Sequence, residues 1–74
     1  MDRLILEDVM KFIKDYIDEN NGLSPSIREI AAGCHINVST ASVYLNILEA
    51  QCRISRKPRT FRSIRIVAKD ANSI

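Results

Sequence analysis

The stretch Ser24-Pro25-Ser26-Ile27-Arg28-Glu29-Ile30-Ala31-Ala32, residues 24–32, holds the clearest helix start in this 74-residue sequence. Pro25 pushes Ser24 towards extended backbone angles. The pattern Ser-x-x-Glu that follows, from Ser26 to Glu29, is a capping box, in which each side chain binds the backbone N–H of the other residue. The stretch therefore predicts a short helix that begins at Ser26 and ends near Gly33-Cys34-His35.

A longer helix is predicted before this start, over residues 4–20. Its apolar residues recur at helical spacing on one face: Ile5, Val9, Phe12, Ile13, Tyr16 and Ile17. Asn20-Asn21-Gly22 ends the helix, and Gly22 suits a left-handed C-cap. The apolar face of such a helix needs a partner to bury it.

A third helix is predicted over about residues 39–51, capped by Asn37 or Ser39. Ala41, Leu45 and Leu48 define its buried side, with Tyr44 at the edge. The opposite face, flanked by Thr40 and Ile47, carries small polar or apolar side chains: Ser39, Ser42, Val43 and Asn46. Such side chains allow close approach to a surface and hydrogen-bond base edges or phosphates. They also tolerate simple exposure to solvent, and this face alone does not distinguish the two interpretations.

After Cys52 the pattern changes to β-rich runs over residues 53–56 and 61–67, separated by the basic loop 57–60. The order of elements predicts a mainly α protein with a small β-hairpin. Specifically, it predicts a winged helix-turn-helix with a three-helix core and a two- or three-stranded antiparallel wing (residues 53–67). We expect one domain over residues 1–67, followed by a flexible tail or linker over residues 68–74.

The charge is strongly polarised along the chain, although the net charge is only +2. Residues 1–50 carry four basic and eight acidic side chains. Residues 51–67 carry six basic side chains and no acidic one: Arg53, Arg56, Lys57, Arg59, Arg62 and Arg65. Charges of one sign protect sheet edges from aggregation, but one or two suffice for that. Six favour a nucleic-acid surface, with roughly four to six phosphate contacts.

The small size and the residue inventory argue against an enzyme. A chain of 8.4 kDa rarely encloses a deep pocket, and the one histidine, His35, has no triad-like partners in the sequence. Cys34 and Cys52 are too few for a zinc site and read as free thiols in a reducing cytoplasm rather than as a disulfide. We expect no catalytic residues, no metal, no cofactor and no small-molecule substrate. No apolar stretch approaches the length of a membrane span, and the apolar run Leu4-Ile5-Leu6 is too short and too close to acidic residues for a secretory signal, so we expect neither.

Three motifs resemble the winged helix-turn-helix of the LexA family, over roughly residues 5–67. These are the run 24–31 quoted above, Ser39-Thr40 followed by Leu45 and Leu48-Glu49, and the strand Arg62-Ser63-Ile64-Arg65-Ile66. Two positions depart from the family pattern, because His35 and Cys52 stand where the family usually has glycine. Such positions often need a left-handed backbone, which histidine tolerates better than cysteine. We therefore expect His35 to be a turn residue, and Gly33 to reshape the turn.

The resemblance implies DNA binding, with the helix 39–51 in the major groove and the wing on the backbone or in the minor groove. By position, the residues that would contact bases or position the helix on them are Ser39, Thr40, Ser42, Val43 and Asn46. Ser26 and Arg28 would meet phosphate, where a helix dipole also favours an anion. Arg56, Lys57 and Arg59 would clamp the DNA from the wing. Asn37 and Arg62 complete the set of candidate DNA-binding residues. The self-cleaving peptidase domain of LexA has no counterpart in these residues, so we expect either an excised N-terminal domain or a small stand-alone relative.

The first hypothesis is a sequence-specific regulator of transcription, most simply a repressor, that binds double-stranded DNA. It would act as a homodimer on an inverted repeat or, more weakly, as a monomer. It would be cytoplasmic, and associated with the nucleoid when bound to DNA. The alternative is a winged-helix protein-interaction module, with Leu4-Ile5-Leu6, Tyr44 and Ile47 as candidate contacts. RNA ranks third, because aromatic residues that stack on single strands are scarce.

Overall fold

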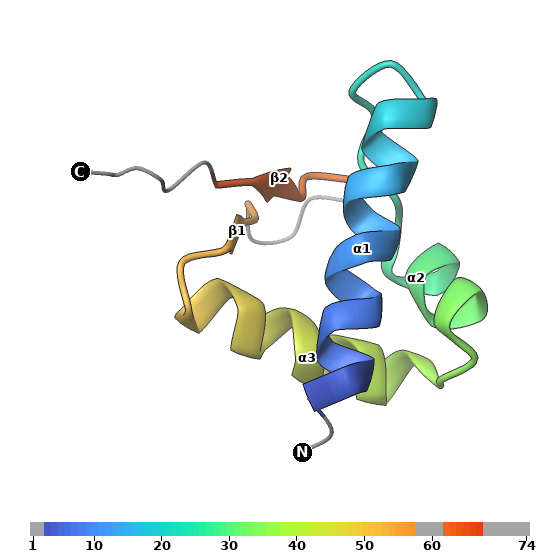
Figure 1. Ribbon diagram of the computed structural model, residues 1–74, viewed down its shortest axis with the longest axis vertical. Coiled ribbons are helices and arrows are strands. Elements are labelled where there is room, and N and C mark those ends of the chain that lie inside the picture. The colour runs from blue at the N-terminus through green and yellow to red at the C-terminus, as the bar shows by residue number, and fades with distance from the viewer. Residues whose placement is uncertain (1–2, 58–61, 68–74) are drawn as a thin grey trace.

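The computed structural model describes residues 3–57 and 62–67, and it has the predicted order of three helices and a hairpin (Figure 1). The helices are α1 (Arg3–Glu19), α2 (Ile27–Cys34) and α3 (Val38–Ala50), and the strands are β1 (Ile54–Ser55) and β2 (Arg65–Ile66). Within the described ranges the wing has two strands. The winged helix-turn-helix class is confirmed. The predicted tail 68–74 and the wing residues 58–61 lie outside the described residues.

Helix α1 runs between the wing and α2, which lie on opposite sides of it, and α3 packs across its N-terminal half (Figure 1). Its buried residues are Leu6, Val9, Met10 and Ile13. Val9 and Ile13 of the predicted apolar face are in the core, and Ile5, Phe12 and Ile17 are partly buried and pack against it, but the prediction omitted Leu6 and Met10. The buried face is broader than one stripe because α1 contacts both α2 and α3.

Helix α2 begins with the predicted capping box. Ser26 Oγ accepts the N–H of Glu29 at 3.2 Å, and Glu29 Oε1 accepts the N–H of Ser26 at 2.8 Å. Near the other end of α2, Gly33 lies directly against the ring of Phe12 on α1. A Cβ at Gly33 would clash with Cε2 of Phe12. Gly33 therefore serves the close approach of α1 and α2.

The turn between α2 and α3 depends on His35, which is left-handed at φ 59° and caps α2. The N–H of Ile36 binds the carbonyl of Ala31 at 3.0 Å, which closes the turn. Cys52 is left-handed in the same way, at φ 60°, where the chain leaves α3 for β1. Both family glycine positions thus keep the left-handed backbone that glycine would adopt, as the resemblance implies.

Replacing Cys52 by glycine is expected to raise the free energy of unfolding by about 1 kcal/mol, because a left-handed non-glycine residue costs about 1–2 kcal/mol. The Cys52 side chain is exposed, so the change loses little packing. Urea unfolding followed by circular dichroism measures the gain. Cys52→Ala keeps a Cβ and should show no gain. An equal gain in both variants would mean that the thiol, and not the backbone, is the source.

Helix α3 supplies the centre of the core. Asn37 is its N-cap, and Asn37 Oδ1 accepts the N–H of Thr40 at 2.7 Å, so of the two predicted caps Asn37 is the correct one. The buried residues of α3 are Ala41, Tyr44, Leu45 and Leu48. Tyr44 is only 4% exposed, and its predicted place at the edge is wrong. Because β1 packs against α3 and extends the core, the buried side of α3 is wider than a two-helix contact would make it.

The wing is a short antiparallel pair, with Ile54 opposite Ile66 and Ser55 opposite Arg65. Its strands are shorter than the β-rich runs predict. The buried side chains Ile54 and Ile64 anchor the wing to the helical core. Ser24, itself buried, accepts the N–H of Ile64 on its Oγ at 3.1 Å. The start of β2 is therefore fastened to the loop between α1 and α2.

Candidate nucleic-acid interface

Ser39, Val43 and Asn46 are exposed along one side of α3, and we call this side the exposed face of α3; Val38, Glu49 and Ala50 at its ends are exposed as well. The first three of these residues are four and three positions apart, so they follow one side of the helix. Val43 keeps 41% of its surface accessible, so an apolar side chain is exposed in the middle of this face. Thr40 and Ser42 are half-buried at the margins. The face therefore offers a hydroxyl, an isopropyl group and an amide, as predicted.

The start of α2 is less open than predicted. Both the hydroxyl and the N–H of Ser26 are used in the capping box, and the Glu29 carboxylate supplies negative charge at this helix end. Arg28 is exposed, and no described acidic side chain forms an ion pair with it. Of the two predicted phosphate contacts here, Arg28 is thus accessible, whereas the N–H of Ser26 is bound to Glu29 and its Oγ already accepts a hydrogen bond.

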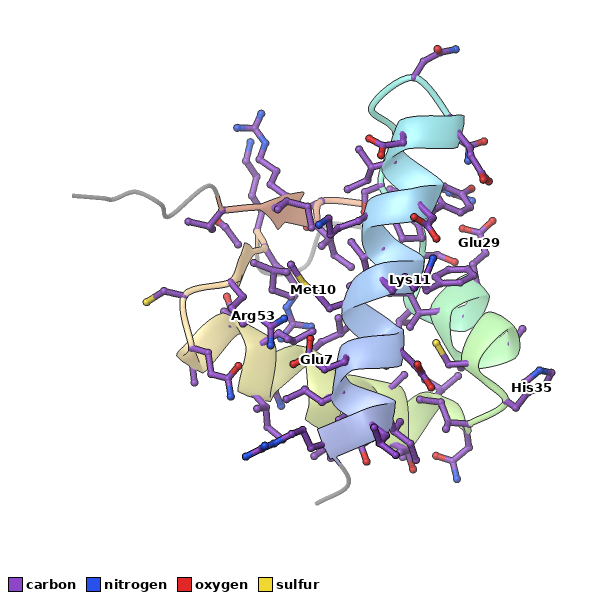
Figure 2. All side chains as sticks on the ribbon, in the orientation of Figure 1. Glu7, Met10, Lys11, Glu29, His35 and Arg53 are labelled. Carbon is purple, nitrogen blue, oxygen red and sulfur yellow. The ribbon has the colours of Figure 1, made fainter. Side chains whose placement is uncertain are left out.

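Of the five wing cations in the described residues, three form ion pairs, and each pairs with a glutamate on a different helix. Arg53 binds Glu7 of α1 through two contacts of 2.8 Å; Figure 2 shows the two side chains pointing toward one another. The other two pairs are Arg56 with Glu49 of α3 at 3.0 Å and Arg62 with Glu29 of α2 at 2.9 Å. The acidic body and the basic wing thus partly neutralise each other. Among the described residues of the wing, Lys57 and Arg65 remain without an ion pair.

Arg62 ties β2 to the first two helices. Its Nη1 lies 2.9 Å from Glu29 Oε1, 3.2 Å from the Tyr16 hydroxyl and 3.2 Å from the Ser24 carbonyl. The Tyr16 hydroxyl in turn donates to Glu29 Oε2 at 3.2 Å. The guanidinium of Arg62 is therefore engaged with the protein itself, although the sequence suggested a DNA contact.

The pKa of the Glu29 carboxyl is lowered from 4.5 to about 2, first by the hydrogen bond from the Ser26 backbone and then by that from Arg62. A lowered pKa means that the folded state favours the charged carboxylate, so its stabilising effect is complete above pH 4.5 and is lost as pH falls towards 2.

We expect the free energy of unfolding to decline through this acidic window, and Glu29→Gln to flatten the decline. Glutamine still offers an oxygen to the Ser26 N–H but carries no charge. Denaturant unfolding of both proteins between neutral and acidic pH measures the effect. The Glu7 pKa is also lowered, through Arg53, but Glu7 titrates in both proteins and cancels in the comparison. Parallel pH curves for the two proteins would contradict the assignment.

Arg56 connects the wing with the exposed face of α3. Its Nη2 donates to Asn46 Oδ1 at 2.6 Å and to Glu49 Oε1 at 3.0 Å, and its Nε donates to the same Glu49 oxygen at 3.3 Å. Arg56 is therefore fixed against α3 and does not extend freely from the wing.

The predicted DNA-binding residues of the wing and of the start of α2 thus do not form one continuous site. Arg56 joins the α3 residues, whereas Ser26 and Arg62 meet around Glu29 at the start of α2. Lys57 is exposed beyond β1, and its N–H binds Ser63 Oγ at 3.0 Å. Arg59 lies outside the described residues. Sequence reasoning missed the three glutamates that pair with the wing. The only signal for them was that each sits in a predicted helix while the wing has no acid of its own.

Other features of the described residues offer little chemistry. They contain no cluster of histidine, cysteine and acidic side chains able to hold a metal ion, and none of their helices has the length and apolarity to cross a membrane. Burial raises the pKa of the Cys34 thiol. A shallow groove of about 390 Å³ lies beside α1. Two of its cations, Lys11 and Arg53, are bound to two of its anions, Asp15 and Glu7.

Comparison with known proteins matches residues 6–63 to the family model of the LexA DNA binding domain. The chain is 40% identical to a LexA repressor of Thermosipho melanesiensis over 63 residues, which cover 85% of this chain and 31% of that protein. It is 39% identical to a LexA repressor of Thermosipho africanus over 61 residues, which cover 82% of this chain and 30% of that protein. The chain thus aligns with somewhat less than a third of these relatives.

Proposed function

This chain belongs to the LexA DNA-binding domain family, and on that premise we propose that it is a sequence-specific repressor of transcription that binds double-stranded DNA. In the bound state α3 lies in the major groove and the wing lies on the backbone or in the minor groove. On this proposal, the chain regulates transcription and is not an enzyme over these residues. It acts on DNA of the nucleoid, in the cytoplasm.

The exposed face of α3 carries this proposal. Ser39, Val43 and Asn46 are accessible together, and the one carboxylate of α3, on Glu49, is held by Arg56. A helix that merely faced solvent would gain from lysine and glutamate there. Small side chains with hydrogen-bonding groups and one apolar group instead match the edges of base pairs, where valine can contact a thymine methyl.

Selection of bound sites from random duplex DNA tests the proposal. We expect a short motif, and we expect it to occur as two inverted half-sites, because few base contacts per chain leave a monomer with modest affinity. Sedimentation of the protein with one-half-site and two-half-site duplexes measures the stoichiometry. Binding that is independent of sequence would contradict specificity. No binding even at low salt would favour the protein-interaction module instead.

Lys57→Ala is expected to reduce the slope of log affinity against log salt by about 0.9, the value for one phosphate contact. Lys57 is exposed, and none of the described acidic side chains pairs with it. Arg53→Ala is the matched control: it removes the same charge from the wing, but that charge is bound to Glu7. Titration of duplex DNA at several salt concentrations measures both slopes. Equal reductions would mean that overall charge, and not contact, governs the salt dependence.

A further inference from the structure

Arg56, Asn46 and Glu49 form a hydrogen-bonded cluster at the point where the wing meets the exposed face of α3. The Nε and Nη2 edge of Arg56 faces Glu49, and Nη2 also contacts Asn46. The Arg56 side chain is 24% exposed and that of Glu49 is 43% exposed, so the cluster is accessible from outside.

The chemistry of arginine fixes which way the Asn46 amide turns. A guanidinium has donors only, so its partner in the 2.6 Å contact must be the amide oxygen. The amide nitrogen of Asn46, with two donors, is then left for an outside partner. Nη1 of Arg56 also carries two donors, and no described residue accepts from it. The free hydrogen-bonding groups of Asn46 and Arg56 are therefore chiefly donors.

The charge of the cluster indicates what those donors would meet. The positive charge of Arg56 is balanced by Glu49, so the cluster has no net charge to attract a phosphate. A neutral partner with acceptors fits better. In the major groove guanine presents two acceptors, N7 and O6, whereas adenine presents one acceptor and one donor. The adenine amino group would need an acceptor here, and Asn46 Oδ1 already accepts a hydrogen bond from the Arg56 guanidinium.

From this arrangement we infer that Asn46 and Arg56 act as one unit that selects guanine over adenine at a single position of the DNA site. This inference rests on the proposed function and deepens it. Arg56 is then a specificity-determining residue through its hold on Asn46, in place of the phosphate clamp suggested by its position in the wing.

The test begins with the motif that the wild-type protein selects, followed by binding to duplexes in which each position is changed in turn. At one guanine the wild type should lose about ten-fold in affinity on change to adenine, within the range of a specific side-chain pair. Asn46→Ala should lose that preference at that position and keep the others. Arg56→Ala and Arg56→Lys should lose it at the same position, because a lysine ammonium lacks the fork that holds Glu49 and Asn46 together. The double variant Asn46→Ala/Arg56→Ala should lose no more than either single variant.

Arg65→Ala is the control, since it removes a wing cation that forms no ion pair with any described residue. It should weaken all duplexes by the same factor and leave the guanine preference intact. The inference is overturned if Asn46→Ala keeps every base preference, or if the Asn46 and Arg56 variants alter different positions. A uniform loss across all sequences in the Arg56 variants would show a phosphate contact and would also overturn it. A wild type that selects no motif would overturn the proposed function instead, and circular dichroism confirms that each variant is folded.

Discussion

Leu48→Ala is expected to lower the free energy of unfolding by about 2–5 kcal/mol, the usual cost of truncating a buried leucine. Leu48 is fully buried on α3 and belongs to the core that joins the three helices and the wing. A core in a chain of this size rarely supplies more than about 3–5 kcal/mol. The variant should therefore be largely unfolded near room temperature, as shown by far-ultraviolet circular dichroism and by a lost or shifted urea transition.

Val38→Ala is the matched control for Leu48→Ala. Val38 is on the same helix but is 44% exposed, so its truncation should change the stability by less than about 0.5 kcal/mol. A folded Leu48→Ala with wild-type stability would contradict the central place of α3 in the core.

Val43→Asp is expected to reduce DNA affinity by about 100-fold or more, because a like charge placed against DNA costs several kcal/mol. Val43 lies between Ser39 and Asn46 on the exposed face of α3. Since its side chain is 41% exposed, the protein should remain folded. Titration of the selected duplex, together with the thermal transition of the free protein, separates binding from folding.

Leu23→Asp provides the comparison for Val43→Asp. It also places an aspartate at an exposed apolar residue, 48% accessible, but in the loop at the far end of α1 from α3 (Figure 1). It adds the same charge to the protein and should weaken binding only slightly. Similar losses in both variants would mean that net charge, and not the α3 face, accounts for the effect.

Local signals in the sequence predicted the helix boundaries and the turns well. The capping box at Ser26 and Glu29 and the cap at Asn37 each depend on residues no more than three positions apart. The left-handed backbone at His35 and Cys52 followed from the family positions that they occupy. Each of these features depends on residues only a few positions apart, so the local sequence is enough to predict it.

The failures concern contacts between elements. Leu6, Met10 and Tyr44 are buried because a second or third element packs against them, and helical periodicity alone does not reveal how many partners a helix has. The free wing charge was overestimated for the same reason. Arg53 and Glu7 are 46 residues apart, and Arg62 and Glu29 are 33 residues apart.

The sequence by itself determined the three helices, the hairpin, their order and the face of α3 that remains exposed, because hydrophobic periodicity and capping act over short distances. Only the tertiary structure decided which cations of the wing are free, which carboxylates they neutralise, and that Arg56 holds Asn46 by its oxygen. A charge acts on whatever lies within a few ångströms of it, and packing brings those neighbours from distant parts of the chain.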